Sequence, residues 1–183
     1  MKRKHIVCPH YGSILIDNWL RRLIHDPKKI FKPYIKQGYT VLDVGCGPGT
    51  FTLDLARMVG EEGVVIALDL QQEMLDKVSM KVGESSLGSR VVVRKCSQDS
   101  LDISDKVDFA LAFHMAHEVP DVTSFLKQLR SVLKPEAKLL LVEPVFHVSS
   151  REFEETVEKA VGVGLKPVSR DRIFLSRAVT FKN

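Results

Sequence analysis

From residue 39 onward, short apolar runs alternate with segments whose apolar residues recur at helical spacing. Runs with the length of buried β-strands fall at 40–44, 64–69, 90–95, 107–113 and 138–143. Amphipathic helical patterns fall at 50–59, 72–82, 122–133 and 151–161. Strands that are apolar almost throughout and alternate with helices are typical of a parallel sheet covered on both faces. The chain is therefore predicted to be an α/β protein with right-handed crossovers.

The two ends of the chain add different elements. Residues 173–182 alternate like an edge strand, and we expect them to pair in a hairpin with 166–169, which places an antiparallel edge on a parallel sheet. Apolar residues at helical spacing over 15–24 predict one helix, and Pro27 favours the start of a second over 27–36. These helices either cover the sheet or roof a ligand crevice. We predict one domain over 1–183, with a helical cover (1–38) and an α/β core (39–183).

Composition sets the class and the compartment. The chain has 183 residues of which 44% are hydrophobic, enough for one compact domain with a core. No apolar run approaches the roughly 20 residues that cross a bilayer, and Asp17 interrupts the N-terminal one, so neither a membrane anchor nor a signal peptide is expected. The three cysteines lack C-x-x-C spacing. We predict a cytoplasmic protein with no metal site.

Positive charge is concentrated near the N-terminus. Residues 1–40 hold nine Lys and Arg and two Asp, a net +7, so the remainder carries −3 of the overall +4. Such a segment could contact nucleic acid, or it could be the solvated face of a helix. No cluster of five or more Lys and Arg, and no aromatic residues interleaved with basic ones, favours nucleic acid. Binding to nucleic acid stays possible but is not favoured.

A glycine-rich turn follows the first expected strand, in the sequence VLDVGCGPGT (41–50). Alternate glycines let the backbone turn sharply and approach a ligand, and the end of such a strand is where nucleotide-like ligands bind. Thr50 stands where a dinucleotide motif has its third glycine, and Pro48 removes an N–H donor, so a pyrophosphate cradle is weakened. Asp43 would repel a phosphate. It either bonds the turn amides or contacts a cationic ligand.

Polar residues also follow the other expected strands. Asp69 ends the second strand about twenty residues after the turn, a position suited to bonding ribose hydroxyls. After the third strand, residues 97–99 either read the edge of an adenine or form a turn with Asp99 as its cap. After the fourth come Phe113, His114, His117 and Glu118. His114 and His117 are three apart and could meet on one helical turn.

Together these segments resemble the class I S-adenosylmethionine-dependent methyltransferases, in particular the small type 11/25-like methyltransferase domains. The resemblance rests on residues 41–49, on Asp69, on 107–113, and on 133–135 leading into 139–144. It covers roughly residues 38–145. It implies a three-layer αβα Rossmann-like sheet of seven strands in the order 3-2-1-4-5-7-6, with strand 7 antiparallel, and S-adenosyl-L-methionine as cofactor.

The resemblance also implies which residues bind the cofactor. Family members commonly carry an acidic residue where this chain has Ser97, so Gln98 or Asp99 would serve the adenine amine instead. The implied cofactor-binding residues are Asp43, Gly45, Cys46, Gly47, Gly49, Asp69, Leu70, Ser97, Gln98, Asp99, Phe113 and His114.

The function expected is methyl transfer to a small-molecule acceptor. We expect His117 or Glu118 to act as a base or to position the acceptor, although both could simply hold their loop. His114, His147 and Tyr11 are further catalytic candidates, and Tyr11, Trp19 and His147 are expected in the wall of the pocket. The alternatives are an RNA or protein methyltransferase, a cofactor-binding partner subunit without catalysis and, least favoured, a dinucleotide-dependent oxidoreductase. The sequence leaves the acceptor atom and the oligomeric state open.

Overall fold

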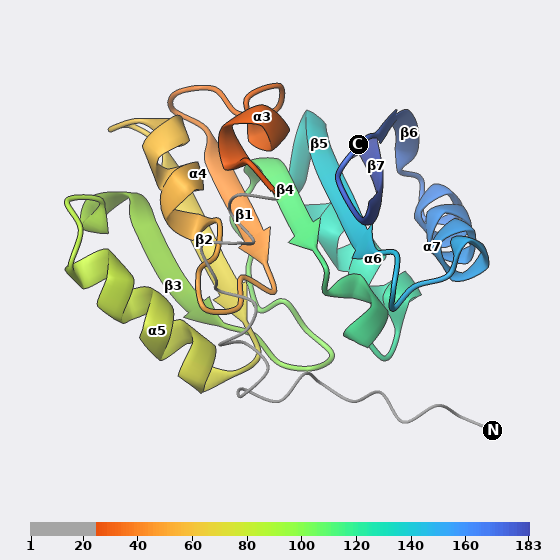
Figure 1. Cartoon of the computed structure of the whole chain (residues 1–183), viewed down its shortest axis with the longest axis horizontal. Helices are drawn as coiled ribbons and strands as arrows, with labels where there is room; N and C mark the ends of the chain where they lie inside the picture. The colour runs from red at the N-terminus through yellow and green to blue at the C-terminus, as the bar shows by residue number, and fades with distance from the viewer. Residues whose placement is uncertain (1–24) are drawn as a thin grey trace.

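The computed structural model describes residues 25–183, which build a seven-stranded sheet in the order β3-β2-β1-β4-β5-β7-β6 (Figure 1). Neighbours among β1 to β5 run parallel, and β7 runs antiparallel to both β5 and β6. The predicted strand order and the antiparallel strand 7 are confirmed. The helix expected over 15–24, together with Tyr11 and Trp19, lies outside the described residues. The strands are β1 (Thr40–Val44), β2 (Val64–Asp69), β3 (Val91–Lys95), β4 (Val107–Phe113), β5 (Leu133–Pro144), β6 (Lys166–Asp171) and β7 (Ser176–Lys182).

Helices cover the two faces of the sheet in separate groups. Side chains of α3, α4 and α5 pack in one apolar cluster, and those of α6 and α7 pack in the other. Successive strand residues point to opposite faces, so Val41 enters the first cluster and Leu42 the second. This confirms three αβα layers. The helices are α3 (Pro27–Phe31), α4 (Thr52–Val59), α5 (Gln72–Gly83), α6 (Val122–Val132) and α7 (Ser150–Gly162), with 3-10 turns η1 (Gly88–Arg90) and η2 (Ala116–Glu118).

Local signals set several helix ends. Gly60 ends α4 with a φ of 75°, a conformation that costs glycine little. Ser149 begins α7 through a reciprocal capping box, in which its hydroxyl accepts from the Glu152 amide and the Glu152 carboxylate accepts from the Ser149 amide. Such a cap contributes about 1 kcal/mol.

The expectation that residues 173–182 form the edge strand is wrong. The strand begins at Ser176 and lies inside the sheet between β5 and β6, with residues 178–181 buried. β6 is the edge strand, and its first five residues are exposed. Alternation along a strand reports which face is apolar but not how many neighbours the strand has.

Two other boundaries also differ from expectation. The helix that starts at Pro27 ends at Phe31 instead of residue 36, because Pro33 has no N–H to donate and its ring disfavours continuation. The fifth strand begins at Leu133 instead of residue 138. Its first residues pair irregularly with β4 and include Glu136 at a φ of 68°, so a stretch that resembles a turn is joined to the strand.

Candidate active site

A cavity of about 430 Å³ opens at the carboxyl ends of the central strands, where their loops converge. Glycine-turn residues, the ends of β2 to β5 and part of α6 line it. Within the described residues, every predicted site residue except Gly49 contributes to the lining. Those residues are Asp43, Gly45, Cys46, Gly47, Asp69, Leu70, Ser97, Gln98, Asp99, Phe113, His114, His117, Glu118 and His147.

The glycine turn has the left-handed backbone for which glycine is suited. Gly45, Gly47 and Gly49 have φ values of 63°, 54° and 79°. A Cβ on Gly45 would lie 2.8 Å from Cγ of Met115, so the turn and the loop after β4 pack too closely for a side chain. A Cβ on Gly47 would meet no atom within 4 Å. The backbone at Gly47 therefore borders open space that a ligand can approach.

Asp69 joins the glycine turn to the end of β2. Its carboxylate accepts the Gly47 amide and the Gln71 amide, both at 2.9 Å. Burial raises the pKa of Asp69, and the amides of Gln71, Gly47 and Leu70 oppose that shift by favouring the charged form. A carboxylate fixed by the backbone on both sides is held rigidly at the cavity wall.

Asp43 is a buried carboxyl group behind the turn. Of the two interpretations, bonding to turn amides does not occur in the contacts observed; its Oδ2 accepts the Thr52 hydroxyl at 2.7 Å, which ties β1 to the start of α4. The pKa of Asp43 is raised to about 7, because burial and, to a smaller extent, the charge of Asp69 raise it by more than the hydrogen bond from the Thr52 hydroxyl lowers it. A cationic ligand in this cavity would favour the ionised form of Asp43.

The loop after β3 forms a turn that leans on α6. Ser97, and not the predicted Asp99, closes the turn, because its hydroxyl accepts the Ser100 amide at 3.1 Å. The Gln128 side chain holds the loop by accepting the Leu101 amide and donating to the Asp99 carbonyl. The loop thus has a fixed position at the cavity edge.

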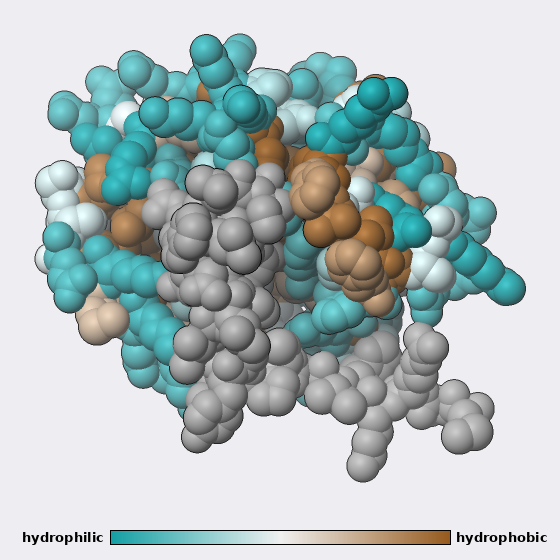
Figure 2. Space-filling model, in the orientation of Figure 1, coloured by the Kyte–Doolittle hydropathy of each residue, from teal (hydrophilic) through white to brown (hydrophobic). Residues whose placement is uncertain are grey.

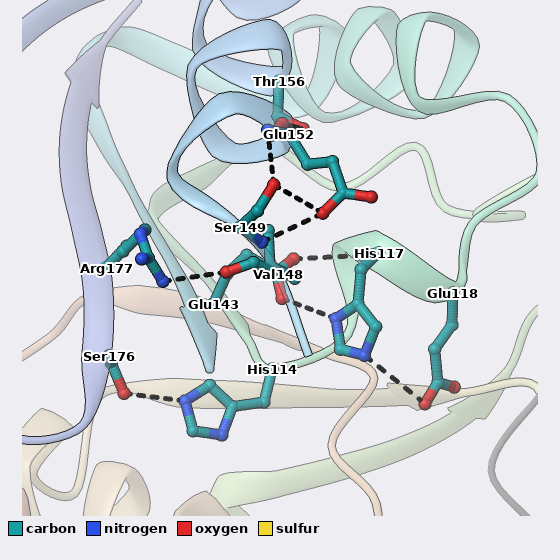
Figure 3. A network of polar contacts seen from close by, with 10 residues as sticks. All are labelled: His114, His117, Glu118, Glu143, Val148, Ser149, Glu152, Thr156, Ser176 and Arg177. Carbon is teal, nitrogen blue, oxygen red and sulfur yellow. Dashed lines mark hydrogen bonds and ion pairs between the residues drawn. The ribbon is translucent and has the colours of Figure 1, made fainter. Parts of the chain in front are cut away.

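Half-buried His117, on the other side of the cavity, forms a dyad with buried Glu143 (Figure 3). The Glu143 carboxylate, 2% exposed, accepts His117 Nδ1 at 2.6 Å and the His117 amide at 3.0 Å. Nδ1 therefore carries its proton toward Glu143, and Nε2 lies 4.0 Å from Glu118. Burial lowers the pKa of His117, but bonding to Glu143 and the charges of Glu143 and Glu118 outweigh it, so the pKa is raised overall.

His114 points away from His117, so the two histidines do not meet on one helical turn (Figure 3). His114 has a φ of 58°, and its Nε2 lies 2.9 Å from the Ser176 hydroxyl at the start of β7. The ring that does meet His117 belongs to His147, with centroids 6.0 Å apart. The backbone reverses direction at His114 and sends the next residues into η2.

Sequence reasoning assigned no role to three residues that shape this site. Glu143 ends a long apolar strand, and a single carboxylate after such a run is a signal that could have identified it. Met115 fills the space beside Gly45. Ser176 carried no signal, since only the antiparallel position of β7 brings it to His114.

Residues 25–183 offer neither a metal site nor a membrane-spanning helix. No group of three or more potential ligands is arranged to hold a metal ion in that part of the chain. No helix among the same residues has the length and apolar character needed to cross a membrane.

Fold and cavity together define a Rossmann-like protein that binds a nucleoside-type cofactor at the switch point of its sheet. A family model described as "Methyltransferase domain" matches residues 41–136, more than half of the chain. The chain belongs to this methyltransferase family, and S-adenosylmethionine is the cofactor that the family and the fold imply. A solved S-adenosylmethionine-dependent methyltransferase from Aquifex aeolicus is 28% identical with a TM-score of 0.88, covering 96% of this chain and 99% of that one.

Curated relatives carry more specific names. A demethylmenaquinone methyltransferase of Lactobacillus johnsonii is 35% identical over 145 residues, covering 75% of this chain and 57% of that protein. A 2-phytyl-1,4-naphtoquinone methyltransferase of Synechococcus elongatus is 34% identical over 111 residues, covering 59% and 47%. The chain thus spans about half the length of these relatives. The [4+2]-cyclase SpnF, 21% identical with a TM-score of 0.70 over 80% of this chain and 59% of that one, shares the fold alone.

Proposed function

We propose that the protein transfers a methyl group from S-adenosylmethionine to a small acceptor of the reduced naphthoquinone class. The observation that carries this proposal is the His117–Glu143 dyad, whose Nε2 side borders the same cavity as the glycine turn. One half of the cavity offers groups suited to a nucleoside cation. The other half offers a histidine that can accept a proton.

The residues present fit the cofactor. Gly47 leaves its backbone open to a ligand, and Asp69 lies at the end of β2, where a carboxylate can accept ribose hydroxyls. Asp43 supplies a buried carboxyl group that a cation would ionise. Further along the wall, Leu70 and the loop 97–99 border the space for an adenine. When bound, S-adenosylmethionine supplies an electrophilic methyl group on a sulfonium and leaves as a neutral thioether.

The acceptor side of the cavity performs the proton step. A bond forms between the methyl carbon and an electron-rich ring carbon, and the acceptor loses one proton. Nε2 of neutral His117 takes that proton, and Glu143 stabilises the imidazolium through Nδ1. The proton then passes to water through the open side near Glu118 and the exposed His147. The remaining acceleration comes from alignment and exclusion of water.

The acceptor class is drawn from chemistry and from the relatives. Methylation of a ring carbon needs an electron-rich ring, which the hydroquinone form provides and the quinone does not. Apolar side chains of Phe113, Met115, Val119 and Phe125 line the cavity and offer a surface for a flat ring. Two relatives are named for naphthoquinone-type acceptors.

The test is a methyl-transfer assay with labelled S-adenosylmethionine and reduced 1,4-naphthoquinones. We expect label in the ring, with a turnover that falls steeply in His117→Ala. Thermal shift with S-adenosylhomocysteine against NAD separates methyl transfer from the oxidoreductase alternative. Label in RNA or protein instead of the naphthoquinol would overturn the acceptor. Binding of S-adenosylhomocysteine without turnover on any of these acceptors would favour a non-catalytic partner subunit.

We also propose that residues 1–183 act as one methyltransferase domain in a reducing compartment such as the cytoplasm. Supporting this, α3 buries Phe31 against Phe51 of the core, with ring centroids 5.2 Å apart. Cys46 and Cys96 are free thiols at the cavity wall. A mass spectrum of alkylated protein, purified without reductant, tests the state of these thiols.

A further inference from the structure

Three large apolar side chains project into solvent from two loops of this molecule. Phe146 is 76% exposed, Phe174 is 62% exposed and Leu175 is 43% exposed. Phe146 lies in the loop after β5, and the other two lie in the turn between β6 and β7. We call these three side chains the apolar ledge. Figure 2 shows apolar atoms gathered on the face where these loops lie in Figure 1.

The ledge has a cost that the fold does not require. Leu175 has a φ of 51°, a left-handed conformation that is unfavourable for leucine and that glycine or asparagine would adopt more easily. Exposure of two phenylalanines adds no packing energy. A turn residue that is both strained and exposed points to a contact with something outside the described core.

Hydrogen bonds attach the ledge to the mouth of the active-site cavity. The Val145 amide donates to the Leu175 carbonyl at 3.1 Å, so the two ledge loops lie side by side. Ser176, next to Leu175, contacts His114 of the cavity wall at 2.9 Å. Phe146 lies in the chain between Pro144 and His147, both of which line the cavity. The ledge therefore lies beside the part of the cavity wall that holds His114, Pro144 and His147.

The cavity has no room for a long hydrocarbon chain beside the cofactor. At about 430 Å³ it is at the lower end of the range, about 300–1,000 Å³, that holds one drug-sized ligand. The cofactor is itself of that size, so a long chain on the reacting ring must leave through the mouth. One relative is named for an acceptor that carries a phytyl chain.

We propose that the apolar ledge binds the isoprenoid tail of the acceptor, so that this protein is specific for naphthoquinols with a long apolar chain. The inference rests on the proposed function for the ring and adds the tail subsite. Phe146 and Phe174 cover the chain where it leaves the cavity, and Leu175 contacts it from the β6–β7 turn. Each covered side chain contributes through burial of apolar area.

The test compares two acceptors that differ only in the tail: reduced 2-phytyl-1,4-naphthoquinone and reduced 1,4-naphthoquinone. In Phe146→Ser/Phe174→Ser we expect kcat/KM for the phytylated acceptor to fall about tenfold or more, and kcat/KM for the short acceptor to stay within about twofold. Leu175→Asn should also weaken the phytylated acceptor while Tm stays level or rises, because asparagine tolerates the left-handed turn. That variant separates loss of the ledge from loss of folding.

Met80→Ser is the matched control, since Met80 is 58% exposed on α5, away from the mouth, and should change neither acceptor. Equal losses of kcat/KM for both acceptors, or no loss for the phytylated one, would contradict the proposed role of the ledge in binding the tail. If the wild type methylates neither, the proposed function fails, and geraniol then tests the ledge alone. We expect geraniol to shift the Leu175 methyl resonances in wild type and the Phe146 and Phe174 ring signals with them. Shifts confined to other residues would exclude a tail subsite. That result is expected if a segment of this chain covers the ledge.

Discussion

The two halves of the cavity are built in different ways. On the β1–β2 side, a contiguous turn supplies backbone groups, and one carboxylate, Asp69, accepts the Gly47 amide of that turn and the Gln71 amide after β2. On the β4–β5–β7 side, the groups are side chains, and they come from three separate segments that meet only in the sheet: His117, Glu143 and Ser176. A nucleoside cofactor needs close approach to a backbone, whereas proton transfer needs a side chain with a tuned pKa.

This difference separates binding from catalysis. Changes on the turn side should alter affinity for the cofactor and leave turnover at saturation intact. Changes on the dyad side should alter turnover and its pH dependence and leave cofactor affinity intact. The predictions below test this separation, beginning with the largest expected effect.

His117→Ala should reduce kcat by about a hundredfold to ten-thousandfold, the contribution of a positioned base. The dissociation constant for S-adenosylhomocysteine, measured by calorimetry, should stay within about twofold. His147→Ala is the matched control, because His147 lies exposed in the same cavity and should cost much less. Comparable losses in both variants would mean that the dyad has no special role.

Asp69→Asn should weaken cofactor binding by tens of fold. The charged carboxylate holds two amides, and such bonds contribute about 1.5–3 kcal/mol each. Calorimetry with S-adenosylhomocysteine measures the loss, and kcat at saturating cofactor should be close to wild type. A fall in kcat with unchanged cofactor affinity would mean that Asp69 contributes to catalysis and not to cofactor binding.

Asp43→Asn should stabilise the cofactor-free protein more at pH 8 than at pH 5, by about 2 kcal/mol. The pKa of Asp43 is about 7 in the folded state and 3.8 otherwise, so the native state binds the proton more tightly. The stabilisation that this carboxyl group contributes to the wild-type protein is therefore fully present below about pH 4 and is lost as the pH rises to about 7. Urea unfolding at both pH values measures the difference. A parallel pH dependence in wild type and variant would exclude the effect.

Glu143→Gln should move the acidic limb of the kcat/KM profile, where His117 becomes protonated and can no longer act as a base, to lower pH and should lower the maximum of the profile. Bonding to Glu143 and its charge raise the pKa of His117, so their loss lets His117 deprotonate at lower pH. Glu118→Gln should move the limb the same way by less, because Glu118 lies 4.0 Å from Nε2 and acts only through its charge. A limb that stays in place in both variants would exclude His117 as the group that titrates.

Sequence patterns predicted much of this architecture, namely the parts that depend on residues close together in the chain. Residues 40–44, 64–69 and 107–113 were assigned to their strands without error, because each is a short apolar run bounded by turn residues. The glycine turn and Asp69 were placed at the cavity from their spacing alone. The position of β7 inside the sheet came from the family resemblance and not from its alternation, which indicated an edge.

The dyad was predicted only in part, because His117 was named from the sequence as a candidate base but Glu143 was assigned no role. The two are 26 residues apart, and no spacing links them. A register of parallel strands that pairs Phe113 with Val142 brings the end of β4 beside the end of β5, and that register sets the 2.6 Å contact. The apolar ledge likewise joins loops that are about thirty residues apart.

The sequence by itself determined the αβα class, the family and the glycine turn with its carboxylates, because these features depend on neighbours along the chain. Tertiary structure alone decided that Asp43 is bound by Thr52, that His114 faces Ser176 while His117 faces Glu143, and that Phe146 lies near Leu175. The Asp43 contact depends on how the turn folds back onto β1, and the others depend on strand register and on the antiparallel return of β7. The physical reason is that local conformation follows local chemistry, whereas pKa values and pocket walls depend on which distant segments the sheet places side by side.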